Sequence, residues 1–347
     1  MNAKKRNAPK AVRKANAGEP IFRLPPYRVE SIVVATAEIQ DWGLRLLNLP
    51  SLWRLSEGSG VKVAVLDTGI DFTHPDLKDA IADARDFTDS RGGPADVQGH
   101  GTHVAGIIAA RRDGRGVVGV APAAQLLVGK VLDDSGAGSL EGVQKGIRWA
   151  VAQGADIISM SLGTQLPDEG LHAVIKEAAD EGVFIICAAG NDALEHVDFP
   201  GAYAECVAVG AVDRGRQIAA YSSVGPEVDI VAPGHEILST YPTKTYAKLS
   251  GTSMAAPFVA GVAALIVAKH REHGGATPVT NQVQLLAHLA QTAIDLGPAG
   301  FDETYGFGLI NPADLLAASA RSLGTLPLPA RLMRSARGTR VAIPDWQ

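Results

Sequence analysis

The sequence predicts an α/β fold with a mostly parallel central sheet and helices on both faces. From residue 61 onward, short apolar and β-branched runs alternate with helical patterns. Strands that are apolar throughout are typical of parallel sheets covered on both faces. With 347 residues, of which 46% are hydrophobic and 20% charged, the chain can bury a sizeable core. The predicted strands are 61–67, 126–132, 156–162, 183–189, 206–212 and 229–232, and the predicted helices are 100–111, 139–153, 169–181, 253–271, 280–293 and 311–320.

Charge is distributed unevenly along the chain. Residues 1–17 carry six Lys or Arg and no acid, and residues 318–347 carry five Arg against Asp345. Removing the +6 and +4 of these ends from the total of −5 leaves −15 on residues 18–317. An acidic body argues against nucleic-acid binding, and the basic N-terminus lacks the interleaved aromatic residues of a nucleic-acid arm. We therefore expect both ends to be basic tails, the first of them disordered.

Several observations argue against membrane insertion and export. No uncharged apolar run reaches 18 residues, as a membrane-spanning helix requires. The basic N-terminus is not followed by the apolar core of a secretory signal. Cys187 and Cys206 sit inside apolar runs, where we expect small buried hydrophobic side chains and no disulfide framework. These observations predict a cytoplasmic protein.

A serine opens the longest apolar helical pattern. Gly251-Thr252-Ser253 precedes it, so Ser253 lies beside the free N–H groups of a helix N-terminus, which can stabilise an oxyanion. Pro257 has no N–H to donate to the carbonyl of Ser253. Taken alone, the pattern is more typical of an ordinary N-cap serine.

Two more chemical groups precede this serine. Asp67-Thr68-Gly69 ends the first predicted strand, which places a carboxylate at the carboxyl edge of the sheet. His100 and His103 open a helix; their spacing does not decide between them, and two histidines without a third ligand are weak evidence for a metal site. Asp-Thr-Gly is also typical of aspartic proteases, and Asp134-Ser135-Gly136 would be its partner. That class requires two all-β lobes, which the alternation of strands and helices argues against.

Together, four blocks resemble the subtilisin family. They are Asp67-Thr68-Gly69, His100-Gly101-Thr102-His103-Val104-Ala105-Gly106, Ala188-Ala189-Gly190-Asn191 and Gly251-Thr252-Ser253-Met254-Ala255-Ala256-Pro257. The order Asp, His, Ser along the chain is also that of the family. The resemblance extends from about residue 40 to about residue 314. It implies a single subtilisin-like peptidase domain at 40–317 and a serine endopeptidase.

The resemblance also implies a role for each chemical residue. Ser253 would be the nucleophile, His100 the general base and later the acid, and Asp67 the carboxylate that orients the imidazole. Asn191 would donate its side-chain amide to the oxyanion, together with the N–H of Ser253. Without the other blocks, Asn191 is equally well explained as a turn residue at a strand end.

Substrate would bind mainly through backbone pairing with two glycine-containing segments, which could otherwise be ordinary turns. The expected substrate-binding residues are Gly136, Ala137, Gly138, Ser161, Leu162, Gly163, Ala188, Gly190 and Asp198. Asp198 falls at the floor of the first pocket, where most subtilisins have a small or neutral residue and the basic-specific proprotein convertases have an acid. With Asp192 at the rim, it leads to the hypothesis that Lys or Arg is favoured before the cut.

By the same resemblance, the expected cofactor is a structural Ca²⁺. Its ligands would be side-chain oxygens of Gln40, Asp76 and Asp113 and backbone carbonyls of Arg111, Arg115 and Val117. Three arginines in this loop depart from the family pattern. A solvated turn is the alternative explanation.

The short leader and Leu24-Pro25-Pro26-Tyr27 resemble the intracellular subtilisins, whose leader carries a similar motif and lies across the active site. Residues 1–39 would then comprise a basic tail and an inhibitory propeptide, although a flexible linker is also compatible with this composition. A homodimer is expected by the same resemblance, and residues 318–347 would form the basic C-terminal tail. The alternative class is a catalytically silent binding or scaffold protein on this fold.

Overall fold

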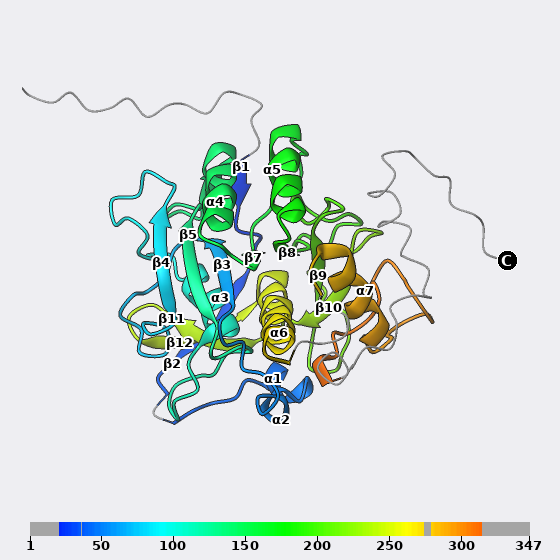
Figure 1. Cartoon of the computed structure of the whole chain (residues 1–347), viewed down its shortest axis with the longest axis horizontal. Helices are drawn as coiled ribbons and strands as arrows, with labels where there is room; N and C mark the ends of the chain where they lie inside the picture. The colour runs from blue at the N-terminus through cyan, green and yellow to red at the C-terminus, as the bar shows by residue number, and fades with distance from the viewer. Residues whose placement is uncertain (1–20, 36, 274–278, 314–347) are drawn as a thin grey trace, which may run out of the picture.

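A computed structural model describes residues 21–35, 37–273 and 279–313 (Figure 1). Its centre is a seven-stranded sheet in the order β10-β9-β8-β7-β3-β5-β4, with every neighbouring pair parallel. The strands are β3 (Lys62–Asp67), β4 (Ile81–Asp86), β5 (Gln125–Lys130), β7 (Ile157–Met160), β8 (Phe184–Ala188), β9 (Val207–Val212) and β10 (Ile230–Pro233). The predicted α/β class is therefore confirmed.

Alternation along the central strand divides the interior into two cores. Val63 and Val65 of β3 belong to the core that also contains side chains of α3 (His100–Ala109) and α6 (Thr252–His273). Ala64 and Leu66 belong to the core with α4 (Leu140–Ala152) and α5 (Glu169–Asp180). Because successive side chains of a strand point to opposite faces, an entirely apolar strand supplies both cores. In Figure 1, α4 and α5 lie on one side of the sheet and α6 on the other.

Helix α6 is the central helix of the larger core. By length and composition it could cross a membrane, but 94% of its most apolar window is buried inside the protein. It packs beneath β7, β8, β9 and β10. A helix that is apolar all round is what this central position requires.

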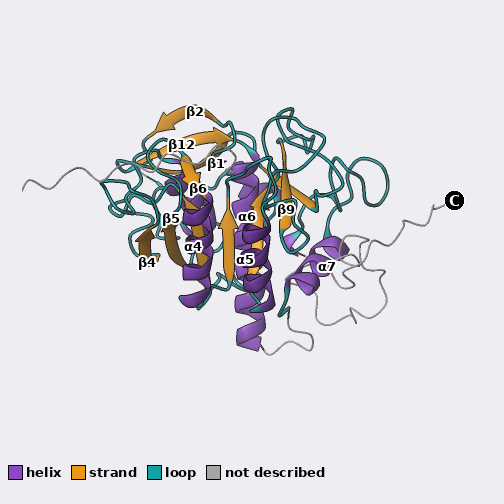
Figure 2. Cartoon of the chain, turned by 90° about the horizontal axis from the view of Figure 1, so that it is seen from above, coloured by secondary structure: helices purple, strands orange, loops and turns teal. Residues whose placement is uncertain are grey.

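Two small antiparallel sheets lie outside the main one. In the first, β1 (Ile21–Arg23) pairs with β6 (Ala137–Ser139). In the second, β11 (Ile237–Tyr241) pairs with β12 (Thr245–Ser250), which pairs with β2 (Arg28–Val33). Figure 2 shows β1, β6, β2 and β12 on the same side of the molecule. The remaining helices are α1 (Trp42–Leu46), α2 (Leu49–Leu52) and α7 (Gln282–Thr292).

The predicted central strands and five of the predicted helices occur within about two residues of their expected ends. Strand β4 was missed because its sequence, Ile-Ala-Asp-Ala-Arg-Asp, is that of a polar edge strand. The two cysteines are buried and unbridged, as expected. Of the helix predicted at 311–320, only residues 311–313 lie within the described part, and the basic ends at 1–17 and 318–347 lie outside it.

Candidate active site

Asp67 and His100 meet at the carboxyl edge of the sheet. Asp67 is the last residue of β3, and His100 is the first residue of α3. Nδ1 of His100 lies 2.8 Å from Oδ1 and 3.1 Å from Oδ2 of Asp67. The backbone N–H of Thr68 donates to the same Oδ1 at 2.7 Å, which fixes the carboxylate. Among the described residues, Nε2 of His100 is buried without a hydrogen-bond partner, so its lone pair is free to accept a proton.

His103 has a different environment. Its Nε2 lies 3.0 Å from each of two carbonyl oxygens, those of Ile237 in β11 and Ala247 in β12. Two acceptors require a proton on Nε2. Burial, opposed by the Ala247 carbonyl, lowers the pKa of His103 to about 3, so the ring stays neutral. This histidine joins α3 to the small sheet, and its geometry is that of a structural residue.

Ser253 lies in the first turn of α6 and is completely buried. Its hydroxyl donates to the carbonyl of Ser161 at 3.4 Å, and the Ser161 hydroxyl donates to the carbonyl of Ser253 at 3.0 Å. The second bond replaces the helical bond that Pro257 cannot make. The released carbonyl expected from the sequence is thus satisfied by a side chain from the end of β7.

Asn191 follows β8, and Thr252 fixes its side chain. Both the backbone N–H and the hydroxyl of Thr252 donate to Oδ1 of Asn191, each at 2.8 Å. Because a backbone N–H can only donate, Oδ1 must face Thr252 and Nδ2 must face the other way. Nδ2 donates to the carbonyl oxygen of Pro26 at 2.9 Å. The amide is therefore directed at a backbone carbonyl, and Oδ1 is held by the residue before Ser253.

One residue that the sequence analysis missed, Asp96, joins the aspartate and histidine loops. Its Oδ1 accepts from the Thr68 hydroxyl at 3.0 Å and from the N–H of Gly99 at 2.7 Å. Its Oδ2 accepts from the N–H and hydroxyl of Thr102 at 2.9 and 2.6 Å. Asp96 thus caps α3 and links it to the residue after Asp67. The Asp-x-x-Gly before His100 was the available signal, but the partner Thr68 is distant in sequence.

The two segments predicted to bind substrate flank a strand of the protein's own N-terminal region. Arg23 exchanges two backbone hydrogen bonds with Gly163, at 3.1 and 3.0 Å. On the other side, β1 pairs with Ala137–Ser139, and the N–H of Leu24 donates to the carbonyl of Gly136 at 3.1 Å. The side chain of Phe22 is fully buried in the core beside α4 and α5. The segments are therefore arranged to add one extended strand between them.

Beyond β1 the chain passes over the candidate catalytic groups. Pro25 is buried and Pro26 is exposed, with the Pro26 carbonyl on Asn191. The ring of Tyr27 lies 5.0 Å from that of His100, and its hydroxyl accepts from Nε2 of Gln98 at 2.6 Å. Burial raises the pKa of Tyr27 to about 12, so its hydroxyl stays protonated. Residues 21–33 therefore run from β1 across the site to β2.

Asp198 lies behind two predicted substrate-binding glycines. A Cβ on Gly163 or on Gly190 would come within 2.9 Å of Oδ2 of Asp198. Asp198 is 6% exposed, and its N–H donates to the carbonyl of Ala189 at 3.0 Å. Of the other predicted residues here, Leu162 and Ala188 are buried core residues. The structure therefore brings the aspartate together with Gly163 and Gly190.

The predicted calcium ligands converge only in part. Asp76 is buried, and its Oδ2 accepts from the N–H of Val117 at 2.8 Å while Oδ1 accepts from the Tyr246 hydroxyl at 3.2 Å. Asp113 is instead ion-paired with Arg115 at 2.9 Å. Within the described ranges, no three His, Cys, Asp or Glu side chains form a group that could hold a metal.

The other predicted calcium ligands in and near this loop make different contacts. The guanidinium of Arg111 donates to the carbonyls of Pro122, Ala124 and Asp79. The N–H of Ile39 donates to the carbonyl of Gly116 at 2.7 Å. This bond holds Ile39, which precedes Gln40, against the loop. Residues 39–40, Asp76 and the loop at 111–117 are therefore neighbours, with one buried carboxylate among them.

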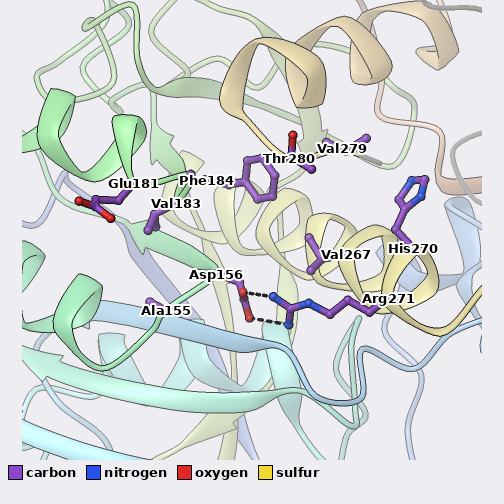
Figure 3. Close-up of a pocket in the computed structure, with 11 residues that line it drawn as sticks. Ala155, Asp156, Glu181, Val183, Phe184, Val267, His270, Arg271, Val279 and Thr280 are labelled. Carbon is purple, nitrogen blue, oxygen red and sulfur yellow. Dashed lines mark hydrogen bonds and ion pairs between the residues drawn. The ribbon is translucent and has the colours of Figure 1, made fainter. Parts of the chain in front are cut away.

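A separate cavity of about 370 Å³ lies at the other end of the strands (Figure 3). It is lined by residues that precede β7 and β8, including Asp156 and Val183, and by His270 and Arg271 near the end of α6. The side chains of Asp156 and Arg271 form an ion pair on its wall. Ligands of parallel α/β sheets bind at the carboxyl ends of the strands, where Asp67 and Asn191 lie. This cavity is therefore not the candidate active site.

Comparison with known proteins decides the family. The model of the subtilase family matches residues 58–308. The chain belongs to the subtilase family. The major intracellular serine protease of Bacillus subtilis (strain 168) is 41% identical over 318 residues, 88% of this chain and 99% of that protein. The intracellular serine protease of Paenibacillus polymyxa is 44% identical over 281 residues, 78% and 85% of the two chains.

A protein named as a subtilisin is similar as well. Subtilisin Savinase of Lederbergia lenta is 43% identical over 276 residues, which is 79% of this chain and 98% of that protein. The family match and the names of these relatives make the protein a subtilisin-like serine protease. As a subtilase, it acts on polypeptides.

The contacts of Asp96 generate a prediction. Replacing Asp96 with Ala removes the acceptor between Thr68 and the start of α3, so Asp67 and His100 lose their mutual alignment. We expect kcat to fall on the order of 10²-fold with KM little changed, because small misplacements of catalytic groups cost about this much. Steady-state kinetics with a peptide p-nitroanilide measures both values.

Asp213→Ala is the matched control, because Asp213 also accepts two backbone N–H groups of its own turn, at 2.8 and 3.0 Å, but lies outside the site. Equal losses of kcat in the two variants would contradict a specific role for Asp96.

Proposed function

We propose that the protein is a serine endopeptidase that works through Asp67, His100 and Ser253. The hydroxyl oxygen of Ser253 attacks the carbonyl carbon of the scissile bond, and its proton passes to Nε2 of His100. The carbonyl oxygen becomes an oxyanion, which accepts from Nδ2 of Asn191 and from the N–H of Ser253. His100 then gives its proton to the leaving amine, and Ser253 is left as an acyl ester.

Water completes the reaction by the same route. His100 takes a proton from the water as its oxygen attacks the ester, and returns the proton to Ser253 as the acid leaves. Asp67 accepts from Nδ1 throughout, which keeps the lone pair of Nε2 directed at the site. The observation that carries this proposal is the buried pair at 2.8 Å between Asp67 and His100, with an unpaired Nε2 on its open side.

The serine hydroxyl is turned toward Ser161 in the covered site. We propose that it turns to His100 when residues 24–27 leave the cleft. A buried nitrogen without a partner favours this change, since the new hydrogen bond removes an unsatisfied acceptor.

Replacing Ser253 with Ala tests the nucleophile. We expect a biotin-linked fluorophosphonate to label the parent chain and not the variant, and peptide hydrolysis to fall to background. Ser51→Ala, at an exposed serine, is the control and should label like the parent. Labelling that survives in Ser253→Ala would place the nucleophile elsewhere. Absence of labelling in both proteins after removal of the leader would favour the silent scaffold.

We also propose that residues 20–39 form an inhibitory leader, part of the segment at 1–39, and that the protein is made as a zymogen. In a bound substrate, the residue that precedes the scissile bond must bury its side chain in the first pocket. The same residue must also present its carbonyl oxygen to Asn191. Next to Asn191, the carbonyl belongs to Pro26, whose side chain is exposed, while the buried side chain is that of the preceding residue, Pro25. This division explains how a segment can occupy the cleft without being cut at once. Neither proline has an N–H for the cleft's acceptors.

Deleting residues 1–39 should therefore raise the initial rate of peptide hydrolysis. A sharper test is Phe22→Ala, because Phe22 is fully buried and its truncation weakens the leader's hold by up to about 3 to 5 kcal/mol. We expect Phe22→Ala to approach the rate of the truncated chain. Ile32→Ala changes a leader residue that is 58% exposed and should behave like the parent. Equal initial rates in all four proteins would exclude inhibition by the leader.

We propose that Ca²⁺ binds beside Asp76, with side-chain oxygens of Gln40 and Asp113 and carbonyls of Arg111, Arg115 and Val117. Support comes from the proximity of residues 39–40, the loop and the buried carboxylate. The pairing of Asp113 with Arg115 opposes it, since this pair would have to open. A site with few anionic ligands binds calcium weakly.

Chelation measures this contribution. EDTA should lower the Tm of Ser253→Ala, a variant that cannot digest itself, and added Ca²⁺ should restore it. At a free Ca²⁺ concentration 100 times Kd, binding stabilises by ~2.7 kcal/mol. Arg115→Ala should bind more tightly, because it frees Asp113. A Tm that neither EDTA nor Ca²⁺ changes would exclude the site.

Two further proposals come from the resemblance to intracellular subtilisins. The names of two relatives support a cytoplasmic location. A homodimer of peptidase domains spanning residues 40–317 is proposed by the same resemblance, without membrane or nucleic-acid partners. Cell fractionation and sedimentation of the purified chain test them.

A further inference from the structure

Two buried oxygen atoms near the candidate active site have no hydrogen-bond partner in the described part of the chain. They are Oδ1 of Asp198 and Oγ of Ser223. The two residues are 6% and 1% exposed. Buried polar groups are nearly always paired, so two unpaired acceptors at one place need an explanation.

The carboxylate of Asp198 and the hydroxyl of Ser223 lie against glycines that line the cleft. A Cβ on Gly190 would lie 2.9 Å from Oδ2 of Asp198 and 3.0 Å from Oγ of Ser223. A Cβ on Gly163 would lie 2.9 Å from the same Oδ2. Gly190 precedes Asn191, and Gly163 pairs with the strand in the cleft. Because neither glycine has a side chain, the Asp198 carboxylate can lie directly against the backbone that lines the cleft.

This carboxylate has no salt-bridge partner in the described chain. The salt bridges among the described residues do not include Asp198. Burial first, and then the Asp192 carboxylate, raises the pKa of Asp198 to about 6, and His196 opposes the rise. At neutral pH the site is thus a buried negative charge without a partner, which is costly for the free protein.

We propose that Asp198 and Ser223 bind the cationic end of a Lys or Arg side chain of the substrate, at the position just before the cut. A guanidinium or ammonium group supplies donors for both oxygens and the missing positive charge. The inference rests on the proposed peptidase function and adds the class of side chain that the cleft selects. It also gives Ser223 a role.

The preference for a basic side chain should increase with pH. Below about pH 6 Asp198 becomes neutral, and above it the carboxylate is charged, with Asp192 and His196 as the titratable neighbours. Selection of a basic side chain should therefore strengthen as the pH rises from 5 to 8. A group whose pKa is raised by burial also destabilises the folded chain above that pKa, because the unfolded chain ionises more easily.

The experiment compares kcat/KM of the purified full chain, after its activity becomes constant, on three peptides that differ only in Arg, norleucine or Phe before the cut. At pH 8 we expect Arg to exceed norleucine by at least about tenfold, as for a hydrogen bond to a charged group. The ratio should fall toward pH 5. Asp198→Asn should abolish the preference, and Ser223→Ala should reduce it.

Glu195→Gln is the matched control, since it removes an exposed charge from the same loop, and it should keep the parent ratio. In a Ser253→Ala background, Asp198→Asn should raise the Tm at pH 8 and have less effect at pH 5. An Arg-to-norleucine ratio near one, or an equal ratio in the parent and Asp198→Asn, would overturn the inference while leaving the peptidase intact. Hydrolysis of none of the peptides would instead contradict the proposed function.

Discussion

The parallel arrangement of β3, β7 and β8 is the constraint on which the site depends. Parallel neighbours end at one edge, so Asp67, Ser161 and Asn191, which end or follow these strands, must lie together. Helices α3 and α6 pack on one face of this sheet and bring their first turns to the same edge. The chemistry therefore follows from the sheet order, although its residues are far apart in the sequence.

Each candidate catalytic group is held by a contact on the side away from the substrate. Thr68 holds Asp67, and Thr252 holds Asn191. The Ser161 carbonyl accepts from the Ser253 hydroxyl, and the Ser161 hydroxyl donates to the Ser253 carbonyl. These contacts satisfy buried polar atoms and also select one orientation for each side chain. Two of the buried atoms left unpaired in the described part, Nε2 of His100 and Oδ1 of Asp198, belong to side chains that a substrate would meet under our proposals.

The chain's own residues 21–33 use the same contacts as the proposed substrate. Backbone pairing with Gly163 and Gly136 needs no particular side chain, so it can serve an internal strand and an external peptide alike. The buried ring of Phe22 adds attachment specific to the leader. The prolines remove the N–H groups of the segment that passes Asn191. Under the proposed inhibition, strong binding and poor cleavage can thus coexist in one segment.

The sequence by itself determined the central strands, the main helices and the resemblance that names Asp67, His100, Asn191 and Ser253, because these depend on local pattern and short motifs. Spacing alone could not choose between His100 and His103, which differ in the contacts of their rings. The small sheets and the hydrogen bonds of Asp96 depend on partners distant in the chain. The unpaired oxygen of Ser223 depends likewise on how distant segments pack. Tertiary structure decided them, since a hydrogen bond is defined by distance in space and leaves no periodic pattern in the sequence.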